Sequence, residues 1–297
     1  MKPLIDVSYW QDPANINYQE LAKHISGVII RVGYTTTGTH TQKIDPHFET
    51  HYAKFKEYGV PVGAYYYSCA TNLSVAEAEA EATIAFLKGK RFEYPIWYDM
   101  EEDQQRALPK SLLTDIAISY CEKLEGAGYY VGLYSWDSWF WEEMEPDRLD
   151  PFDIWAARTA GEPRIRHGIW QYSHTGRLPG YNSNIDLNRA YKDHPKIIKD
   201  AGLNGYSKPS STYPVNSIYI NGSASIQGYS EPDWKGQYGP IKRPHIIIHA
   251  VERADIGENS FVRDQINDTW YWIKSGTSWK VRGGWSPELG SVMVTIT

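Results

Sequence analysis

Apolar residues between residue 1 and about residue 200 form short continuous runs, and segments with helical spacing lie between these runs. The runs predict strands over 4–9, 27–34, 60–70, 94–100, 129–136, 153–158, 168–173 and 184–190. Apolar residues with the period of a helix predict helices over 17–24, 48–59, 74–89 and 111–128. Strands that alternate with helices indicate a parallel sheet of β/α units, and this many strands in so short a segment favour a closed barrel.

The pattern changes near residue 203. Residues 203–216 are rich in Ser, Pro, Gly and Asn, which is typical of a linker. Residues 217–297 show strand-like alternation without a helical period, and they predict a small all-β module. We therefore expect a barrel domain over 1–202, a linker over 203–216 and a C-terminal module over 217–297.

Composition limits the classes of function that this chain can have. Of the 297 residues, 41% are hydrophobic and 22% are charged, and the net charge of −6 argues against nucleic acid as the main partner. No apolar run approaches the ~20 residues of a membrane span. The N-terminus lacks the apolar stretch of a signal peptide, so we expect synthesis in the cytoplasm without a leader. The excess of 12 Trp and 23 Tyr over 7 Phe suits a groove for sugar rings, although a Trp-rich core would have the same composition.

The segment YPIWYDMEED (94–103) is a buried strand that ends in a cluster of carboxylates. Residues i and i+2 of a strand point to one face, so Trp97, Asp99 and Glu101 should share a face. The rise of a strand places Asp99 and Glu101 roughly 6–7 Å apart, within the range of carboxylate separations that glycosidases use. Glu102 and Asp103 fit a simpler interpretation, that of solvated acids in a loop.

Two further strands place an Asp among apolar residues. Asp6 lies in the first strand and Asp186 in the last, and a buried Asp is costly unless it is paired or functional. If the barrel closes, these strands are neighbours, and all the carboxylates gather at one mouth. Aromatic side chains near strand ends would line this acidic cleft, which suits the cleavage of sugars: Tyr65, Tyr67, Trp97, Tyr134, Trp170 and Tyr172.

Five motifs in the first domain resemble glycoside hydrolase family 25, the Chalaropsis-type lysozymes or N-acetylmuramidases. The motifs are IDVSYWQ (5–11), G-x-Y-Y-Y (63–67), D-x-E (99–101), WQY (170–172) and IDLN (185–188). The resemblance implies a flattened barrel of five β/α units followed by three strands. It also implies hydrolysis of the β-1,4 bond between N-acetylmuramic acid and N-acetylglucosamine in peptidoglycan. Tyr66 stands where many relatives have His.

The resemblance implies that Glu101 is the general acid, with Asp6, Asp99 and Asp186 as its partners. Like-charge repulsion would keep Glu101 protonated, whereas Asp99 is expected to stay ionised. The estimated separation falls between the geometries of retaining and inverting glycosidases, so the sequence does not choose between retention and inversion of the anomeric centre. A barrel, a linker and a small β-module without a leader look like a phage endolysin, which would be released to act on the cell wall.

Other motifs carry less chemistry. The two histidines of HIIIH (245–249) are spaced for a helical metal site, but three isoleucines between them favour a strand, where they lie too far apart. We therefore expect no metal and no cofactor. In the module, Trp270 and Trp272 share a strand face and are candidates for stacking on wall carbohydrate, although a small core also needs large side chains.

Two other functions stay open on the sequence. The first is a non-catalytic wall-binding or virion structural protein that retains the barrel. The second is a metal-dependent wall deacetylase or amidase, against which the lack of a plausible ligand set argues.

Overall fold

The computed structural model describes residues 2–207 in full and, in the rest of the chain, the backbone of seven strands. Contacts within the chain separate two units, Met1–Ser207 and Lys208–Thr297. The first unit carries all the carboxylates that the sequence singles out.

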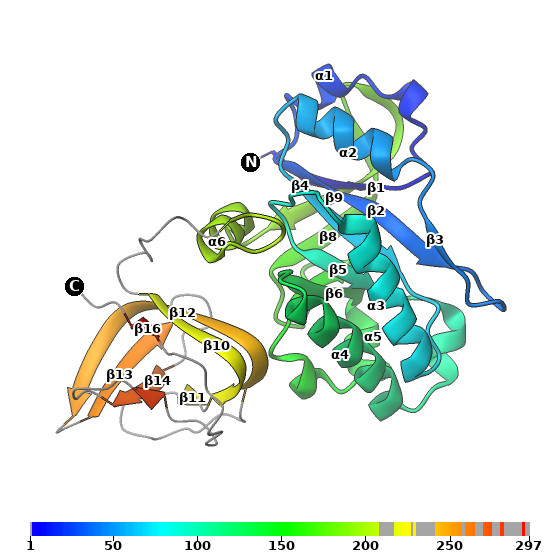
Figure 1. The fold of residues 1–297 in the computed structure, drawn as a ribbon. Helices are drawn as coiled ribbons and strands as arrows, with labels where there is room; N and C mark the ends of the chain where they lie inside the picture. The colour runs from blue at the N-terminus through cyan, green and yellow to red at the C-terminus, as the bar shows by residue number, and fades with distance from the viewer. Residues whose placement is uncertain are drawn as a thin grey trace. The chain divides into compact units, whose positions relative to one another are not determined.

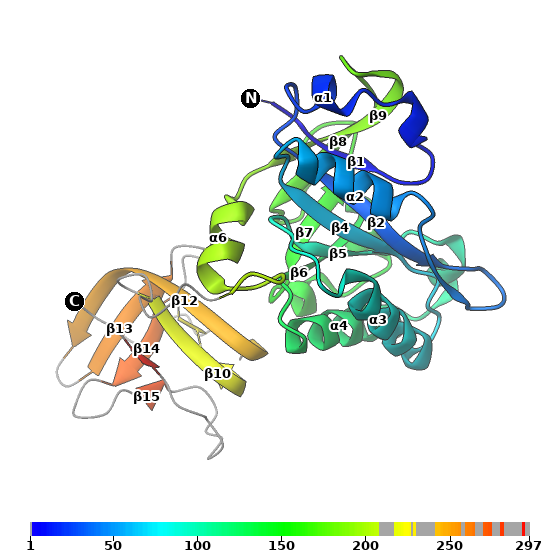
Figure 2. The ribbon, with the colours of Figure 1, turned by 45° about the horizontal axis from the view of Figure 1, so that its top comes forward.

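Eight strands of the first unit form a closed barrel in the order β1, β2, β4, β5, β6, β7, β8 and β9 (Figure 2). Their bounds are β1 Leu4–Val7, β2 Gly27–Thr35, β4 Val62–Tyr67, β5 Ile96–Asp99, β6 Val131–Trp136, β7 Asp153–Ala157, β8 Ile169–Leu178 and β9 Tyr181–Ala190. Neighbouring strands from β1 to β8 run parallel, and the short strand β3 (Gln42–Ile44) pairs with β2 in the antiparallel sense. The predicted closed α/β barrel is therefore confirmed.

Helices follow each of the first five parallel strands and cover the outside of the barrel (Figure 1). Their bounds are α1 Tyr18–Leu21, α2 Phe48–Glu57, α3 Leu73–Leu87, α4 Lys110–Gly126 and α5 Asp137–Glu142. Short 3-10 helices lie at Pro13–Asn15, Asp103–Ala107 and Pro146–Leu149. Five β/α units followed by three strands is the arrangement that the sequence led us to expect.

Four local features differ from the expectation. Helix α3 begins at Leu73, one residue before the predicted helix over 74–89, and its cap is Asn72, whose side chain accepts a hydrogen bond from the amide of Val75. Helix α5, strand β3 and a sixth helix, α6 (His194–Ala201), were not predicted. All three are short. Helices α5 and α6 have six and eight residues, too few repeats of the apolar period to be recognised, and β3 has only three residues.

The last strand also runs against the predicted parallel direction. β9 is antiparallel to both β8 and β1. β8 ends at Leu178 and β9 starts at Tyr181, so the connection is a tight turn, whereas parallel strands need a long crossover. Gly180 in this turn has φ +96°, and an added Cβ would lie 2.5 Å from the backbone nitrogen of Leu21.

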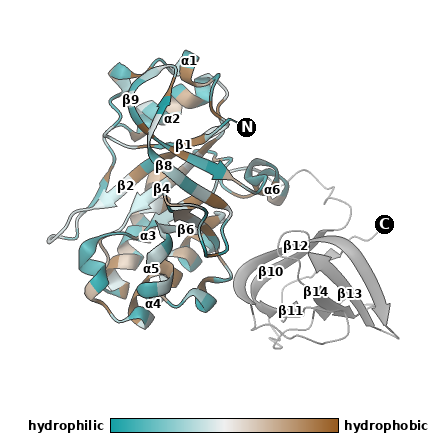
Figure 3. Ribbon diagram, turned by 180° about the vertical axis from the view of Figure 1, so that it is seen from behind, coloured by the Kyte–Doolittle hydropathy of each residue, from teal (hydrophilic) through white to brown (hydrophobic). Residues whose placement is uncertain are grey.

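Side chains fill the barrel from within and cover it from outside. Inside, the Trp97 and Trp155 rings meet edge to face at 5.7 Å, and a Cβ on Gly132 would lie 2.4 Å from the Trp97 ring. Outside, apolar side chains of the strands pack against the helices, which carry both apolar and polar residues along α3 and α4 (Figure 3). The interior is thus a packed core, and open space for chemistry remains at its ends.

The amino-terminal end of the barrel is closed by residues that follow β9. Asp153 accepts hydrogen bonds from Nζ of Lys192 at 3.0 Å and from Nε2 of His194 at 2.7 Å. Buried Asn204 accepts from the amide of Tyr130 at 2.7 Å and donates to the carbonyl of Tyr94 at 2.9 Å. The first residues of the predicted linker therefore belong to the barrel unit, because Asn204 satisfies backbone groups at its base.

The described strands of the second unit pair antiparallel, in the order β11, β14, β13, β12, β10 and β16, and β15 pairs with β14. Their bounds are β10 Ser217–Ile226, β11 Gly228–Tyr229, β12 Ile241–Ile256, β13 Asn259–Asp264, β14 Trp270–Lys274, β15 Lys280–Val281 and β16 Met293–Val294. HIIIH lies within β12, so its expected strand is confirmed. Trp270 and Trp272 lie in β14, and their side chains are outside the described part of the chain.

Candidate active site

Four carboxyl side chains come from strands that meet at the carboxyl-terminal mouth of the barrel. Asp6 on β1 lies directly opposite Asp186 on β9 in the antiparallel register. Asp99 is the last residue of β5, and Glu101 follows two positions after it. The structure therefore brings together the carboxylates that strand alternation predicted.

Asp6 is held by two side-chain amides. Its Oδ2 accepts hydrogen bonds from Gln171 at 3.0 Å and from Asn188 at 2.8 Å. Trp155 donates to Oδ1 of Asn188, and Tyr134 donates to Oε1 of Gln171, both at 2.7 Å. Because each amide oxygen is already occupied by a donor, each amide must present its NH₂ group to the carboxylate.

Gln171 also spans the strand pair that closes the barrel. Its Nε2 lies 3.4 Å from Oδ2 of Asp186, in addition to its bond to Asp6. On the other side of Asp186, Nδ1 of His174 lies 3.7 Å from Oδ1. The interaction with Asp186 raises the pKa of His174, so a positive charge is favoured beside this carboxylate.

Burial opposes ionisation throughout this cluster. Burial, followed by the charge of Asp186, raises the pKa of Asp6 to about 8. Burial and then the charge of Glu101 raise the pKa of Asp99 well above its usual range. Burial also raises the pKa of Glu101, whereas a hydrogen bond from Trp136 and the charge of His174 lower it.

These shifts correct the expectation that Asp99 stays ionised in the free protein. Asp99 is 4% exposed, and its buried Oδ1 has no hydrogen-bond partner among the described residues. Glu101 is only partly buried. A negative charge is therefore more costly on Asp99 than on Glu101. The charge of Arg31 acts in the opposite direction and lowers the pKa of Asp99.

The aromatic residues predicted to line the cleft divide into two groups. Tyr65, Tyr67 and Tyr134 lie at the mouth. Burial is the largest cause of the raised pKa of each, and the charges of the nearby carboxylates raise it further. Trp97 is fully buried beneath the mouth, so it supports the cleft from inside the core. Trp97 was therefore misplaced by the sequence as a substrate-contacting residue.

In the WQY motif, the side chain of the middle residue points toward the carboxylates. Gln171 points into the barrel, whereas Trp170 donates from Nε1 to the carbonyl of Arg158 and packs edge to face against Tyr172 at 5.7 Å. Trp170 and Tyr172 are thus not brought to the carboxylates. Tyr66 faces the helices and bonds to Oγ1 of Thr35 at 2.9 Å, so its departure from the family pattern lies outside the cleft.

The loop after β5 is less open than its sequence suggests. Glu102 is partly buried and accepts a hydrogen bond from the hydroxyl of Tyr67 at 2.9 Å, so it is not the solvated acid that we expected. Asp103 is exposed, as expected. Buried Gln105 donates to Oγ of Ser68 at 3.1 Å and fixes the loop that carries Glu101.

Sequence reasoning missed Gln171, Asn188 and Arg31. Asn188 could have been found from strand alternation, since it lies two positions from Asp186, whereas a period of two leaves open whether Gln171 or its aromatic neighbours face inward. Arg31 is a single charge within the apolar run of β2, a signal that was present but not used.

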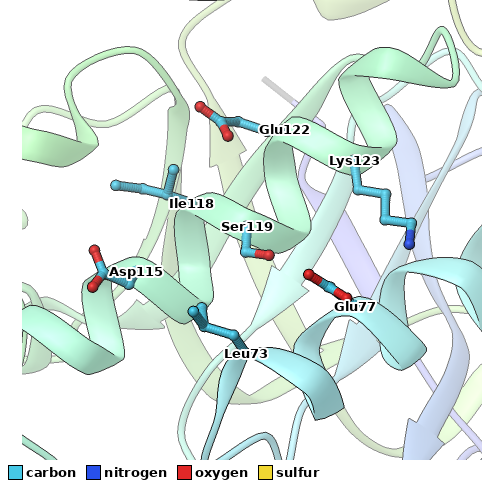
Figure 4. A pocket seen from close by; sticks show the side chains of 7 residues that line it. All are labelled: Leu73, Glu77, Asp115, Ile118, Ser119, Glu122 and Lys123. Atoms are coloured by element: carbon cyan, nitrogen blue, oxygen red, sulfur yellow. The ribbon is translucent and has the colours of Figure 1, made fainter.

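An open pocket lies apart from the barrel mouth, between the outer helices α3 and α4 (Figure 4). Its lining residues are Leu73, Glu77, Asp115, Ile118, Ser119, Glu122 and Lys123.

Within the described residues, no group of three or more His, Cys, Asp or Glu side chains is arranged to hold a metal ion. Over the same part of the chain, no helix has the length and apolar character needed to cross a bilayer.

Comparisons with known proteins identify the family and the fold of the first unit. The model of glycosyl hydrolases family 25 matches residues 5–181. An uncharacterized protein of Escherichia coli O6:H1, YegX, is 25% identical over 205 residues, which cover 62% of this chain and 67% of YegX.

Solved structures share the fold. The modular autolysin LytC from Streptococcus pneumoniae, in complex with a synthetic peptidoglycan ligand, is 25% identical with a TM-score of 0.54, over 63% of this chain and 46% of LytC. The catalytic domain of endolysin ply40, from a bacteriophage of Listeria monocytogenes, is 24% identical with a TM-score of 0.56, over 67% of this chain and 97% of that domain.

The raised pKa of Asp6 predicts how stability depends on pH. A carboxyl group whose pKa is raised from 3.8 to about 8 stabilises the folded state below about pH 4, and this contribution is lost as the pH rises through 8. Asp6→Asn can keep both amide bonds without the charge. We expect the variant to gain stability relative to the parent between about pH 5 and about pH 8.5, by on the order of 1–3 kcal/mol.

Denaturant unfolding at the two pH values measures this gain. Asp103→Asn, at an exposed position of the same mouth, is the matched control and should show no such dependence. A difference between Asp6→Asn and the parent that stays constant with pH would contradict the prediction.

Proposed function

This chain belongs to glycosyl hydrolases family 25, and we propose that it is a peptidoglycan hydrolase that cleaves the β-1,4 bond between N-acetylmuramic acid and N-acetylglucosamine. The observation that carries the proposal is the Asp99–Glu101 pair. These two carboxyl groups lie at the end of one strand, and burial raises the pKa of each. The peptidoglycan ligand bound by LytC supports this class of substrate.

Glu101 is the general acid of the proposed reaction. It is the more exposed member of the pair, so a leaving sugar oxygen can approach it, and burial raises its pKa, which favours the protonated form that an acid needs. Gln105 fixes the loop that carries it. The acid is thus held in position before the substrate binds.

Asp99 takes the charge when the proton resides on Glu101. Its buried Oδ1 then serves as an acceptor for the 2-acetamido N–H of the substrate if that group attacks the anomeric carbon. If a water attacks instead, the same oxygen orients the water. The nearby charge of Arg31 stabilises this ionised form of Asp99.

Asp6 and Asp186 hold the other side of the cleft. The amide of Gln171 fixes Asp6, and it links Asp6 to Asp186 across the closing strands. These carboxylates raise the cost of any further negative charge at the mouth, which favours the protonated form of the acid. A protein that retains the barrel only for binding has no need of this buried arrangement, which supports turnover.

We further propose that residues 217–297 bind wall carbohydrate, with Trp270 and Trp272 as stacking residues. The sequence pattern of a linker followed by an aromatic-rich β-module supports this assignment. The same architecture supports an endolysin, made in an infected host cell and released onto the bacterial wall.

The products of digestion test the bond that is cleaved. Purified peptidoglycan treated with the full chain should yield muropeptides with N-acetylmuramic acid at the new reducing end, which mass spectrometry after borohydride reduction identifies. N-acetylglucosamine at that end, or newly freed peptide amines, would exclude the proposed bond. The anomer formed first, followed by NMR, distinguishes retention from inversion.

Glu101→Gln preserves the shape and the hydrogen-bonding capacity of the side chain but cannot supply a proton. We expect the rate of wall hydrolysis to fall by roughly 10²–10⁴-fold, the usual contribution of a positioned acid. Clearing of a wall suspension measures the rate, and Asp103→Asn serves as the control, with an expected change below about twofold. Turnover by Glu101→Gln at the parental rate would remove Glu101 from the mechanism.

The module should contribute to wall binding and not to bond cleavage. We expect a chain that ends at residue 207 to hydrolyse soluble glycan fragments at the parental rate but to sediment poorly with intact walls. The full-length Glu101→Gln variant should sediment with walls as the parent does. Equal sedimentation of the shortened and full chains would show that the module does not bind.

A further inference from the structure

A completely buried carboxylate lies between helix α3 and the barrel. Glu79 is 0% exposed, and it shares the inner face of α3 with Ala76, Ala80 and Thr83. Burial raises the pKa of Glu79, whereas the hydrogen bonds that it accepts act in the opposite direction. A buried acid is costly unless its oxygens find donors, so the groups that bond to Glu79 indicate its role.

The donors to Glu79 come from the ends of two barrel strands. Its Oε2 accepts from the hydroxyls of Ser68 at 2.8 Å and Tyr98 at 2.5 Å. Its Oε1 accepts from the backbone amide of Cys69 at 3.0 Å. Ser68 and Cys69 directly follow β4, and Tyr98 lies in β5, one residue before Asp99. Glu79 therefore joins the two strand ends that lie beside the catalytic carboxyl groups.

Ser68 connects Glu79 to the loop after β5. Its Oγ accepts from the amide of Ala70 and from Nε2 of Gln105, both at 3.1 Å, so its single hydrogen remains free to donate to Glu79. Nε2 of Gln105 also donates to the carbonyl of Ala70 at 3.1 Å, which fixes the orientation of this amide. Gln105 is 0% exposed and lies four positions after Glu101.

The residues on either side of Glu101 are held by the strands that flank β5. Ser135 donates to the carbonyl of Met100 at 2.6 Å, and Tyr67 donates to the carboxylate of Glu102 at 2.9 Å. Both neighbouring strands thus fix the backbone around the acid. The contacts of the buried Glu79 add a third point of support, further along the same loop.

We propose that Glu79 is a positioning residue for the general acid Glu101, acting through the hydroxyl of Ser68 and the amide of Gln105. This inference rests on the proposed function and adds to it a residue that does not touch the substrate. An acid transfers its proton only from a narrow range of positions, so a displaced loop slows protonation of the leaving group. The competing interpretation is a structural role, in which Glu79 stabilises the packing of α3 without a specific effect on the acid.

The substitution Glu79→Gln keeps the size of the side chain but replaces one oxygen by an NH₂ group. If this group faces Ser68, the hydroxyl meets a third N–H donor and can no longer accept from Gln105. If it faces Cys69 instead, two N–H groups point at each other. In either orientation the bonds around the end of β4 cannot all form, and the support of the loop is weakened.

Two soluble substrates separate the positioning of the acid from a general loss of structure. Both present N-acetylmuramic acid at the bond that is cleaved. One is the tetrasaccharide of two peptidoglycan disaccharides, whose leaving group is a sugar, and the other is the dinitrophenyl β-glycoside of one disaccharide. A sugar leaves only with help from an acid, whereas dinitrophenolate leaves without a proton. The Glu101→Gln variant sets the reference, since it should lose kcat/KM for the tetrasaccharide and largely retain it for the aryl glycoside.

We expect the full-length Glu79→Gln variant to show the same selectivity. Its kcat/KM for the tetrasaccharide should fall by roughly 10–100-fold, the usual effect of a misplaced catalytic group. Its kcat/KM for the aryl glycoside should change by less than about threefold. Equal losses for the two substrates would overturn the proposal and assign Glu79 a structural role.

The matched control is Glu81→Gln. Glu81 lies on the same helix, but it is exposed and pairs with Lys123 at the surface. Because an exposed ion pair contributes little, kcat/KM for both substrates should change by less than about twofold.

Ser68→Ala carries the same test if Glu79→Gln fails to fold, since it removes the connecting hydroxyl and leaves the carboxylate in place. A loss confined to the tetrasaccharide supports the proposal, and equal losses for the two substrates overturn it. In a folded Glu79→Gln protein, adding Gln105→Ala should lower kcat/KM by no more than about twofold beyond the larger single effect, because both residues act through one chain of contacts. Losses that multiply would also overturn the proposal.

The parent protein distinguishes failure of this inference from failure of the proposed function. Hydrolysis of walls and of the tetrasaccharide by the parent, together with equal losses in the variants, would overturn only the role of Glu79. No hydrolysis of either by the parent would overturn the proposed function and the role of Glu79 with it.

Discussion

Two carboxylates face each other across the strand pair that closes the barrel, and the rest of the mouth is arranged around this contact. Closure by an antiparallel β9 puts Asp186 opposite Asp6, where two negative charges would repel at short range. The amides of Gln171 and Asn188 compensate Asp6, and His174 lies beside Asp186. Tyr134 and Trp155 orient those amides, so the inner aromatic residues also depend on the same closure.

The pKa of a buried acid is shifted in opposite directions at the two ends of the barrel. At the base, Lys192 and His194 overcome the effect of burial and lower the pKa of Asp153, so this carboxylate is ionised and paired. At the mouth, burial prevails and raises the pKa of Asp6, Asp99 and Glu101. A paired charge is typical of structure, whereas unpaired acids with raised pKa are typical of a functional site. The difference between the paired acid at the base and the acids of raised pKa at the mouth indicates that the mouth residues serve function and not stability.

Strand alternation located the carboxylates because the apolar neighbours of Asp6, Asp99 and Asp186 identify their strands as buried. The same rule could not orient WQY, since a period of two allows either the aromatic pair or the central Gln171 to face inward. The reversed direction of β9 follows from the short turn at Gly180, and a sequence shows the length of a turn more clearly than the pairing it imposes. The deeper burial of Asp99 relative to Glu101, which raises the pKa of Asp99, emerges only when the whole mouth is assembled.

Asn204 closes the base of the barrel well after the last barrel strand has ended, and beyond the segment that matches the family. Its side chain satisfies an amide that follows α4 and a carbonyl that precedes β5, so the final residues of the unit join segments that are distant in the sequence. Any replacement of the second unit by another is therefore constrained at this point. A breakpoint before Asn204 would leave two backbone groups of the recipient barrel unsatisfied, whereas a breakpoint after Ser207 would transfer a module without this cost.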